Sequence, residues 1–167
     1  GVISGSTNVC VGGMVTFTSS VSGGTWSASN SNATVSVSGD VTGVSVGTVV
    51  ISYSFTNSCG TDIATFNVNV IATPTAGTIT GPTNVCPGST ISLSNATPGG
   101  TWSASNANAT VSGVGIVTGV TAGTVNISYT VSASCGSAST FQTVTVDPLP
   151  NPGTISGSST VCIGGTT

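Results

Sequence analysis

The stretch WSASNSNATVSVSGDVTGVSVGT (26–48) decides the fold, because it recurs with few changes as WSASNANATVSGVGIVTGVTAGT (102–124). The offset between the two copies is 76 residues. The same offset separates Cys10 from Cys86 and Cys86 from Cys162. Self-similarity at a fixed period of this size indicates a chain of similar structural units stacked in series.

The repeat also sets the predicted domain boundaries. Residues 1–76 and 77–152 align without a gap, and half of the aligned positions are identical. The segment 153–167, GTISGSSTVCIGGTT, opens in the same way as both of them. We therefore predict two full repeats, 1–76 and 77–152, followed by the start of a third at 153–167. We interpret the chain as an internal piece of a longer exported protein.

Each repeat is predicted to consist of short β-strands, because apolar and polar residues alternate and Gly or Asn ends each run. No helical periodicity is visible. About seven strands per repeat, with one apolar face each, predict an all-β fold of β-sandwich domains whose inner faces interdigitate. In the first repeat the expected strands are 2–4, 15–17, 25–28, one centred on Val35, one on Val41 and Val44, one with Val49, Ile51, Tyr53 and Phe55 inward, and one with Phe66, Val68 and Val70 inward.

The quoted stretch resembles the core motif of bacterial Ig-like domains of group 2. It contains W-S-x-S, an A-T-V strand and G-x-V-T-G-V-x-x-G-T in that order. The flanking V-C-x-G (9–12) and S-C-G (58–60) resemble Ig-like and PKD-like tandem repeats of large cell-surface proteins of Bacteroidota-type bacteria. This resemblance implies tandem Ig-like β-sandwich domains in an exported, surface-attached protein, often an adhesin or a surface fibre. The cysteines and the near absence of charge depart from invasin-type relatives, so no host receptor is implied.

Composition argues against several classes of function. The chain has no Lys, Arg or His, and its only charged side chains are Asp40, Asp62 and Asp147. Binding to nucleic acid or to anionic lipid needs cationic side chains. General acid–base catalysis near neutral pH usually needs His, a raised carboxyl group or a depressed Lys. None of the three carboxylates recurs in the other repeat, where Ile116, Ala138 and Ile71 align with them. We therefore expect no enzyme activity, no cofactor and no metal site.

The five cysteines are the sharpest chemical feature of the sequence: Cys10, Cys59, Cys86, Cys135 and Cys162. Metal binding lacks His and a Cys-x-x-Cys pair, and a catalytic thiolate lacks a cationic neighbour. Disulfides suit an exported chain without helices.

Two disulfide pairings remain open. A within-repeat scheme joins Cys10 to Cys59 and Cys86 to Cys135, and base rates favour bridges within one domain. In an Ig-type sandwich, however, the turn after Cys10 and the turn holding Cys59 lie at opposite ends of the domain, farther apart than the ~7 Å that a disulfide allows between Cα atoms. Repeats stacked head to tail would instead bring Cys10 close to Cys135. We take this pairing between repeats as the leading hypothesis. The within-repeat scheme would leave Cys162 to pair beyond residue 167.

Four aromatic residues are predicted to belong to the cores: Trp26 and Tyr53 in the first repeat, and Trp102 and Tyr129 in the second. A tryptophan on the third strand of an Ig sandwich normally fills the core. Sugar stacking is the alternative for both tryptophans. Glycosylation sequons also occur, at Asn32, Asn95, Asn108 and Asn126.

These observations predict a structural stalk or filament, located outside the cell on its surface or in a secreted fibre. A surface almost without charge suits a protein that is assembled with further repeats or copies of itself, because soluble monomers usually rely on charge to stay apart. The linkers 71–76 and 147–152 contain proline, which favours semi-rigid spacers. The alternative function is an adhesin whose repeats bind a glycan or a protein. No apolar run approaches the ~20 residues of a membrane span.

Overall fold

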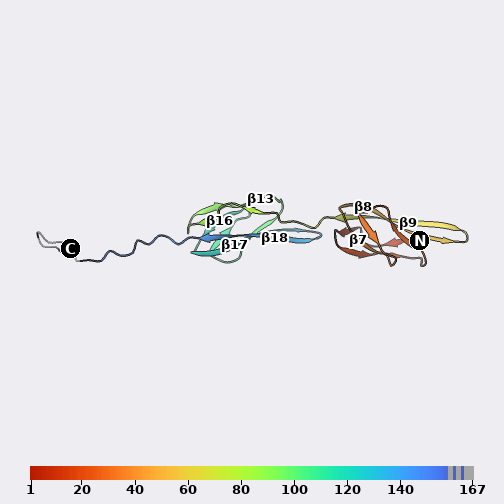
Figure 1. The fold of residues 1–167 in the computed structure, drawn as a ribbon, viewed down its shortest axis with the longest axis horizontal. Helices are drawn as coiled ribbons and strands as arrows, with labels where there is room; N and C mark the ends of the chain where they lie inside the picture. The colour runs from red at the N-terminus through yellow and green to blue at the C-terminus, as the bar shows by residue number, and fades with distance from the viewer. Residues whose placement is uncertain (158–159, 161–162, 164–167) are drawn as a thin grey trace. The chain divides into compact units, whose positions relative to one another are not determined.

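The structure is a computed structural model that describes residues 1–157, 160 and 163 of the chain. Every regular element in this part is a β-strand (Figure 1). No helix there is long and apolar enough to cross a lipid bilayer. The predicted start of a third repeat, including Cys162, lies largely outside the described residues.

Nine strands form in the first 76 residues, two more than the sequence predicts. They are β1 Ile3–Ser4, β2 Asn8–Cys10, β3 Met14–Thr16, β4 Thr18–Ser19, β5 Thr25–Ala28, β6 Ala33–Val35, β7 Asp40–Gly43, β8 Gly47–Asn57 and β9 Gly60–Ile71.

Nine further strands follow in the same order. They are β10 Ile79–Thr80, β11 Asn84–Val85, β12 Thr90–Ser92, β13 Ser94–Asn95, β14 Thr101–Ala104, β15 Ala109–Val111, β16 Ile116–Gly119, β17 Gly123–Ala133 and β18 Gly136–Val146. Each begins 76 residues after its counterpart, so the period of the sequence is also the period of the strands. The residues between β9 and β10 carry no regular structure.

Two sheets form the sandwich of the first repeat. One has the strand order β2-β9-β8-β5, and the other has the order β3-β7-β6. A short pair, β1 with β4, lies beside them. The pairing of β2 with β9 is parallel, with Cys10 opposite Ile71, while β8 and β9 form a long antiparallel hairpin. The second repeat has the same topology, with β11-β18-β17-β14 and β12-β16-β15.

Alternation along the strands places the core between the two sheets. In β8, Val49, Ile51 and Tyr53 are buried, while the intervening residues are only partly covered. They pack with Val41 of β7, which is fully buried, on the opposite sheet. Residues two apart on a strand share one face, so this pattern explains why the segment forms a strand with one apolar side.

The core of the second repeat is built from the equivalent positions, with one change of partners. Phe17 and Phe66 meet edge to face in the first repeat, with ring centroids 5.3 Å apart. Leu93 and Gln142 stand at these positions in the second. Leu93 is buried, and the Gln142 amide donates to the carbonyl of Gly81 at 3.1 Å.

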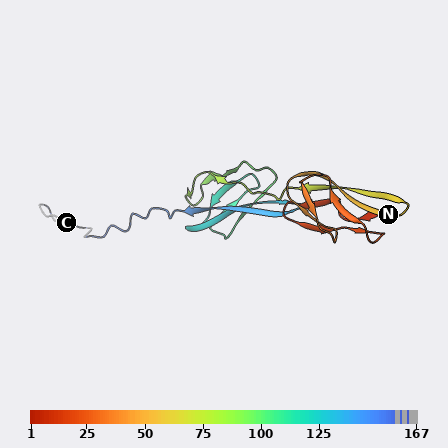
Figure 2. The same cartoon turned by 45° about the vertical axis from the view of Figure 1, so that its right-hand side comes forward.

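The β8–β9 hairpin is longer than the rest of its sandwich. Its register runs without interruption from Gly47 opposite Val70 to Asn57 opposite Gly60. The hairpin turn projects beyond the other strands of the first repeat (Figures 1 and 2). Phe55, which the alternation places inward, is therefore only half-buried, because the opposite layer ends before it.

The chain divides into two compact units whose limits differ from the predicted domains. The first unit contains Gly1–Thr78 together with Asn95–Thr101 and Tyr129–Thr140. The second contains Ile79–Ser94, Trp102–Ser128 and the described part of Phe141–Thr167. The turn of the β17–β18 hairpin thus belongs to the first unit, although it lies in the second sequence repeat.

One residue that the sequence places in a strand lies outside it, on the surface. Val44 was placed with Val41 on one strand, but β7 ends at Gly43, and 51% of Val44 is exposed. The Val44 amide instead donates to the carbonyl of Asn32 at 2.8 Å, which turns the chain out of the sheet.

Candidate functional site: a disulfide between repeats

Cys10 is held at the end of β2 by a tight turn. The Gly13 amide donates to the Cys10 carbonyl at 2.8 Å, and the Gly12 amide donates to the Gly43 carbonyl at 2.9 Å. Gly12 has a φ of +77°, a backbone conformation that favours glycine. Because β2 pairs with β9 in parallel, the turn fixes Cys10 beside Ile71, at the carboxyl end of β9.

Cys135 occupies the turn of the second long hairpin. It lies between β17, which ends at Ala133, and β18, which begins at Gly136. Its Sγ atom is 3.9 Å from the carbonyl oxygen of Ile71. The hairpin turn therefore reaches the same place on the first unit at which the Cys10 turn is fixed.

In the structure a disulfide joins Cys10 to Cys135. Their Cα atoms are 5.6 Å apart, within the usual range for such bonds, and 125 residues separate them in sequence. The Asn95 side chain also donates to the carbonyl of Ala76 at 2.7 Å, and Ala76 is buried. One covalent contact and one polar contact thus join residues of the two sequence repeats.

The other two described cysteines are exposed free thiols. Cys59 lies in the turn of the β8–β9 hairpin, and Cys86 lies directly after β11. The structure does not bring Cys10 and Cys59 together. Cys10 is level with Ile71, whereas Cys59 lies at the other end of β9, and eleven residues of strand span roughly 36 Å. The within-repeat pairing is thus incompatible with this register.

The four predicted core aromatic residues lie on adjacent strands of the two larger sheets, a Trp on one strand and a Tyr on the next. Trp26 and Tyr53 are opposite each other in the β5–β8 register, with ring centroids 4.7 Å apart. The Tyr53 hydroxyl accepts from the Gly24 amide at 2.7 Å, and the Tyr129 hydroxyl accepts from the Gly100 amide at 2.8 Å. Both tyrosines are buried. Trp26 and Trp102 are half-buried and pack against the two cores.

A shallow hollow of about 260 Å³ opens beside Trp26. Tyr53 and Phe17 line it together with hydroxyl side chains, among them Thr18 and Ser38. Phe17 and Tyr53 are buried, so the half-buried Trp26 is the ring that a ligand could reach. A partly exposed ring beside hydroxyl groups has the chemistry of a weak sugar site, since aromatic rings present an apolar face.

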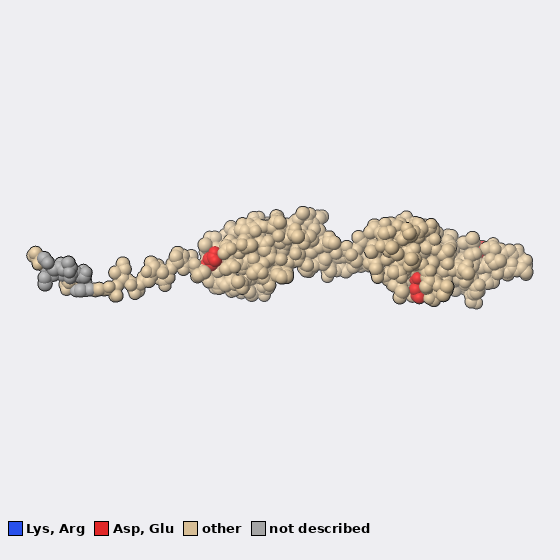
Figure 3. All heavy atoms as spheres, viewed as in Figure 1, with Lys and Arg blue, Asp and Glu red and all other residues tan. Residues whose placement is uncertain are grey.

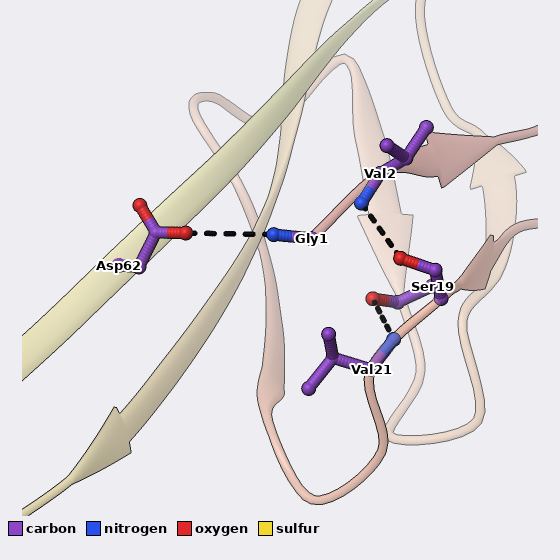
Figure 4. A network of polar contacts seen from close by, with 6 residues as sticks. Gly1, Val2, Ser19, Val21 and Asp62 are labelled. Carbon is purple, nitrogen blue, oxygen red and sulfur yellow. Dashed lines mark hydrogen bonds and ion pairs between the residues drawn. The ribbon is translucent and has the colours of Figure 1, made fainter.

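The three carboxylates lie apart on an otherwise uncharged surface (Figure 3). Thr16 and then Ser38 donate hydrogen bonds to Asp40, at 2.7 and 2.8 Å, and these bonds lower the pKa of its carboxyl group. The Gly1 amine lies 3.4 Å from Asp62 (Figure 4), and the Asn84 amide donates to Asp147 at 3.0 Å. Within residues 1–157, 160 and 163, no three His, Cys, Asp or Glu side chains converge on a position for a metal ion.

No protein-family model matches the sequence, and no curated protein matches it either. The likenesses are to solved structures. A C-terminal fragment of intimin, in complex with the intimin-binding domain of its translocated receptor, superposes with a TM-score of 0.51 and 22% identity. The match covers 86% of this chain and 63% of the fragment. The fold is Ig-like. The prediction of an all-β chain of Ig-like sandwiches is thereby confirmed.

Two weaker likenesses involve surface proteins. A SusE-like surface-located polysaccharide-binding protein from the Bacteroides thetaiotaomicron heparin utilisation locus has a TM-score of 0.36 and 12% identity, over 87% of this chain and 34% of that one. The S-layer protein SbsC has a TM-score of 0.34 and 22% identity, over 82% and 23%. Likenesses of this strength carry no functional argument.

Proposed function

We propose that the chain is part of an extracellular structural stalk or filament, built from tandem Ig-like repeats whose neighbours are joined by disulfides. The repeats are 1–76 and 77–152, with a third beginning at 153. The observation that carries the proposal is the Cys10–Cys135 bond, because it links the turn after β2 of one repeat to a hairpin of the next. A bridge of this kind resists extension at the point where two domains would otherwise separate.

The low surface charge and the disulfide support the same function. Three carboxylates are the only charged side chains, so little repulsion opposes association with further copies. Disulfides persist in oxidising compartments, which supports a location outside the cell. The Thr16 and Ser38 hydroxyls that donate to Asp40 have no counterpart of this carboxylate in the second repeat, where Ile116 stands at its position, and we therefore propose a mechanical function and no catalysis.

Electron microscopy of material isolated from the cell surface tests the proposal directly. We expect thin fibres whose axial repeat equals the length of one Ig-like domain, and whose stiffness falls when the disulfides are reduced. The matched control is the same material alkylated without prior reduction, which should keep its stiffness. Dispersed globular particles, or fibres whose stiffness does not respond to reduction, would contradict the proposal.

The hollow beside Trp26 supports one alternative, an adhesin that binds a glycan. The intimin fragment is in complex with a receptor domain, so a fold of this kind is compatible with binding, but likeness in fold does not transfer a ligand. A glycan array probed with the oxidised chain distinguishes the two functions. Binding that shifts the Trp26 indole resonance would favour the adhesin, whereas a blank array would favour the stalk.

A further inference from the structure

The four Asn-x-Ser/Thr sequons are not equally accessible in the folded chain. Asn32, Asn95 and Asn108 are half-buried, whereas Asn126 is exposed. A sequon of this kind is the acceptor of an N-linked oligosaccharide in an exported protein. Because such a glycan is bulky and polar, it has to project from the folded surface into solvent. The surroundings of each asparagine therefore decide which sequon is able to carry one.

Two of the sequons are closed by contacts that the repeat builds twice. The Asn32 side-chain nitrogen donates to the Thr48 carbonyl at 3.2 Å, and its oxygen accepts from the Ser45 hydroxyl at 2.9 Å. The equivalent Asn108 makes the same two kinds of contact, at 3.2 and 3.0 Å. A Cβ added at Gly47 would lie 2.4 Å from the Asn32 nitrogen, so a sugar on this nitrogen would have no room.

The third sequon is closed by the end of the first repeat. The Asn95 side-chain nitrogen donates to the carbonyl of Ala76, which is buried. Its side-chain oxygen accepts from the Thr97 amide at 2.8 Å. A glycan on Asn95 would have to displace the buried Ala76 segment.

The fourth sequon is open. Asn126 lies in β17 between the buried Val125 and Ile127, so its side chain faces away from the core. The Thr143 hydroxyl of β18 donates to its side-chain oxygen at 2.8 Å. Among the described residues, none accepts a hydrogen bond from its side-chain nitrogen. Ser128, the third residue of the sequon, lies two positions further along β17 and therefore on the same face.

An exposed aromatic ring lies beside Asn126. Phe141 is 64% exposed, and it precedes Thr143 by two positions on β18, so these two side chains share a face. Since Thr143 bonds to Asn126, Phe141 is a diagonal neighbour of Asn126, and such neighbours on adjacent strands are roughly 7–8 Å apart. A sugar attached to Asn126 therefore begins within reach of the apolar face of the Phe141 ring.

Both the asparagine and the ring are specific to the second repeat. Val50 and Thr65 stand at the positions of Asn126 and Phe141 in the first repeat. The sequon hydroxyl, by contrast, is present in both repeats. Asparagine is depleted in the interior of strands, so Asn126 is not explained by the needs of β17. A glycan gives the two substitutions on this face a common use.

We propose that Asn126 carries an N-linked oligosaccharide whose first sugar packs against the exposed ring of Phe141. The proposal rests on the export of the chain proposed above. The donor is an oligosaccharide carried on a polyprenyl pyrophosphate, and the Asn126 side-chain nitrogen attacks its anomeric carbon. A carbon–nitrogen bond forms, the bond from this carbon to the pyrophosphate oxygen breaks, and the pyrophosphate takes up the proton that the nitrogen loses. No oxidant or reductant is required.

The fold selects among the sequons after this transfer. A strand held by its ladder hydrogen bonds is not free to enter an enzyme site, so transfer precedes the pairing of β17. The folded domain then tolerates a glycan on Asn126, whereas a glycan on Asn32, Asn95 or Asn108 would prevent the contacts described above. Asn126 also lies seven residues before the end of β17, roughly 23 Å along the strand, which leaves the hairpin turn with Cys135 uncovered.

Peptide mapping of material isolated from the cell surface tests the proposal. Enzymatic removal of N-linked glycans in ¹⁸O-water converts each glycosylated asparagine to labelled aspartate, which mass spectrometry locates. Chymotrypsin places Asn126 in peptide 103–129 together with Asn108, and fragmentation separates the two. We expect the label on Asn126 alone. An unlabelled Asn126, or a label on Asn32, Asn95 or Asn108, would overturn the proposal.

Variants of the full chain, secreted from a host cell that attaches such oligosaccharides, provide matched controls. The wild type should carry one glycan, and Ser128→Ala should carry none although it keeps the Asn126 side chain. Asn126→Val should also carry none and should fold, because Val50 stands there in the first repeat. Thr34→Ala removes the sequon of Asn32 and should keep the single glycan. A glycan that persists in Ser128→Ala would contradict the assignment.

The contact with the ring has its own readout. Removing the glycan enzymatically should lower the melting temperature of the wild type by a few degrees, and by less in Phe141→Thr, which carries the first-repeat residue. An equal change in both chains would refute the contact with Phe141. Failure of this inference is distinguishable from failure of the stalk function. Stiff fibres with a bare Asn126 would contradict the glycan alone, and a dispersed glycosylated chain would contradict the stalk alone.

Discussion

At the residue scale, two glycines with similar backbone angles allow the cost of backbone strain to be measured separately from the cost of a steric clash. Gly39 has a φ of +90°, and an added Cβ would lie 2.4 Å from the carbonyl oxygen of Phe17 and 3.1 Å from the Trp26 ring. Gly23 has a φ of +86°, and its nearest neighbour would be the Phe55 ring at 3.8 Å. A side chain at either position therefore costs a similar backbone strain, but only at Gly39 would it also clash with a neighbouring atom.

Gly39→Ala should consequently destabilise the protein more than Gly23→Ala. We expect about 1 kcal/mol for Gly23→Ala, from the left-handed backbone alone. We expect roughly 2–4 kcal/mol for Gly39→Ala, because a backbone oxygen must also move. Urea unfolding of both variants measures the difference. Equal losses would mean that the strand end at Gly39 relaxes without resistance.

Asp40 gives the chain a small dependence of stability on pH. Hydrogen bonds from Thr16 and Ser38 lower its pKa in the folded state, so the unfolded chain takes up the proton first as the pH falls. The stabilisation is present above the unfolded pKa of about 3.9 and is lost below it. We expect a constant melting temperature from pH 8 to pH 5 and a decline below about pH 4 that Asp40→Asn largely removes.

Thermal melts followed by circular dichroism over this pH range provide the measurement. Ile116 stands at the equivalent position of the second repeat, so the fold itself does not depend on a carboxylate there. A cooperative loss of structure between pH 7 and pH 4, or an equal decline in Asp40→Asn, would contradict the assignment.

At the scale of the strand and hairpin, the disulfide is expected to control the β17–β18 turn more than the sandwiches. Residues 129–140 belong to the first unit, and Cys135 is bonded to it there. Reduction should speed amide hydrogen exchange in this hairpin turn while leaving β15 and β16 protected, because the second core retains its apolar contacts.

Cys10→Ser together with Cys135→Ser provides the same state without reductant, and Cys59→Ser is its control. The chain-entropy model assigns about 5 kcal/mol to closing so long a loop, although measured gains are often smaller. Faster exchange spread evenly over β15, β16 and the hairpin would show instead that the bond supports the sandwich of the second repeat.

The elements also show how far the sequence predicts the structure. The long strands follow from alternation, since Val49, Ile51 and Tyr53 are both periodic and buried. The strands β2 and β4, of three and two residues, are too short to show a period, so the strand count rises from seven to nine. Phe55 is half-buried because β8 extends beyond the opposite sheet. The local sequence of β8 carries no information about where that other sheet ends.

The disulfide, too, could be predicted from the sequence only in part. The repeat and the poles of an Ig sandwich favour a bond from Cys10 to Cys135, but the sequence alone leaves the within-repeat pairing open. The deciding contact is the parallel pairing of β2 with β9, which aligns Cys10 with Ile71. This pairing joins segments about sixty residues apart, and its direction is not encoded by either short segment.

At the scale of the whole molecule, the chain carries three carboxylates as its only charged side chains. Each one aligns with an apolar residue of the other repeat: Asp40 with Ile116, Asp62 with Ala138 and Asp147 with Ile71. The repeated fold therefore does not depend on a charged side chain at any of these positions.

Replacing Asp62 and Asp147 by their counterparts should change the stability of the chain only slightly. We expect Asp62→Ala with Asp147→Ile to shift the free energy of unfolding by less than about 1 kcal/mol, because surface charges interact weakly in water. Urea unfolding at 10 and 500 mM salt measures the effect, and the difference from the wild type should shrink at the higher concentration because salt screens it. Asp40→Ile removes a carboxylate that accepts hydrogen bonds from Thr16 and Ser38 and should therefore cost more stability. If the paired variant lost as much stability as Asp40→Ile, Asp62 and Asp147 would make contacts that the fold requires.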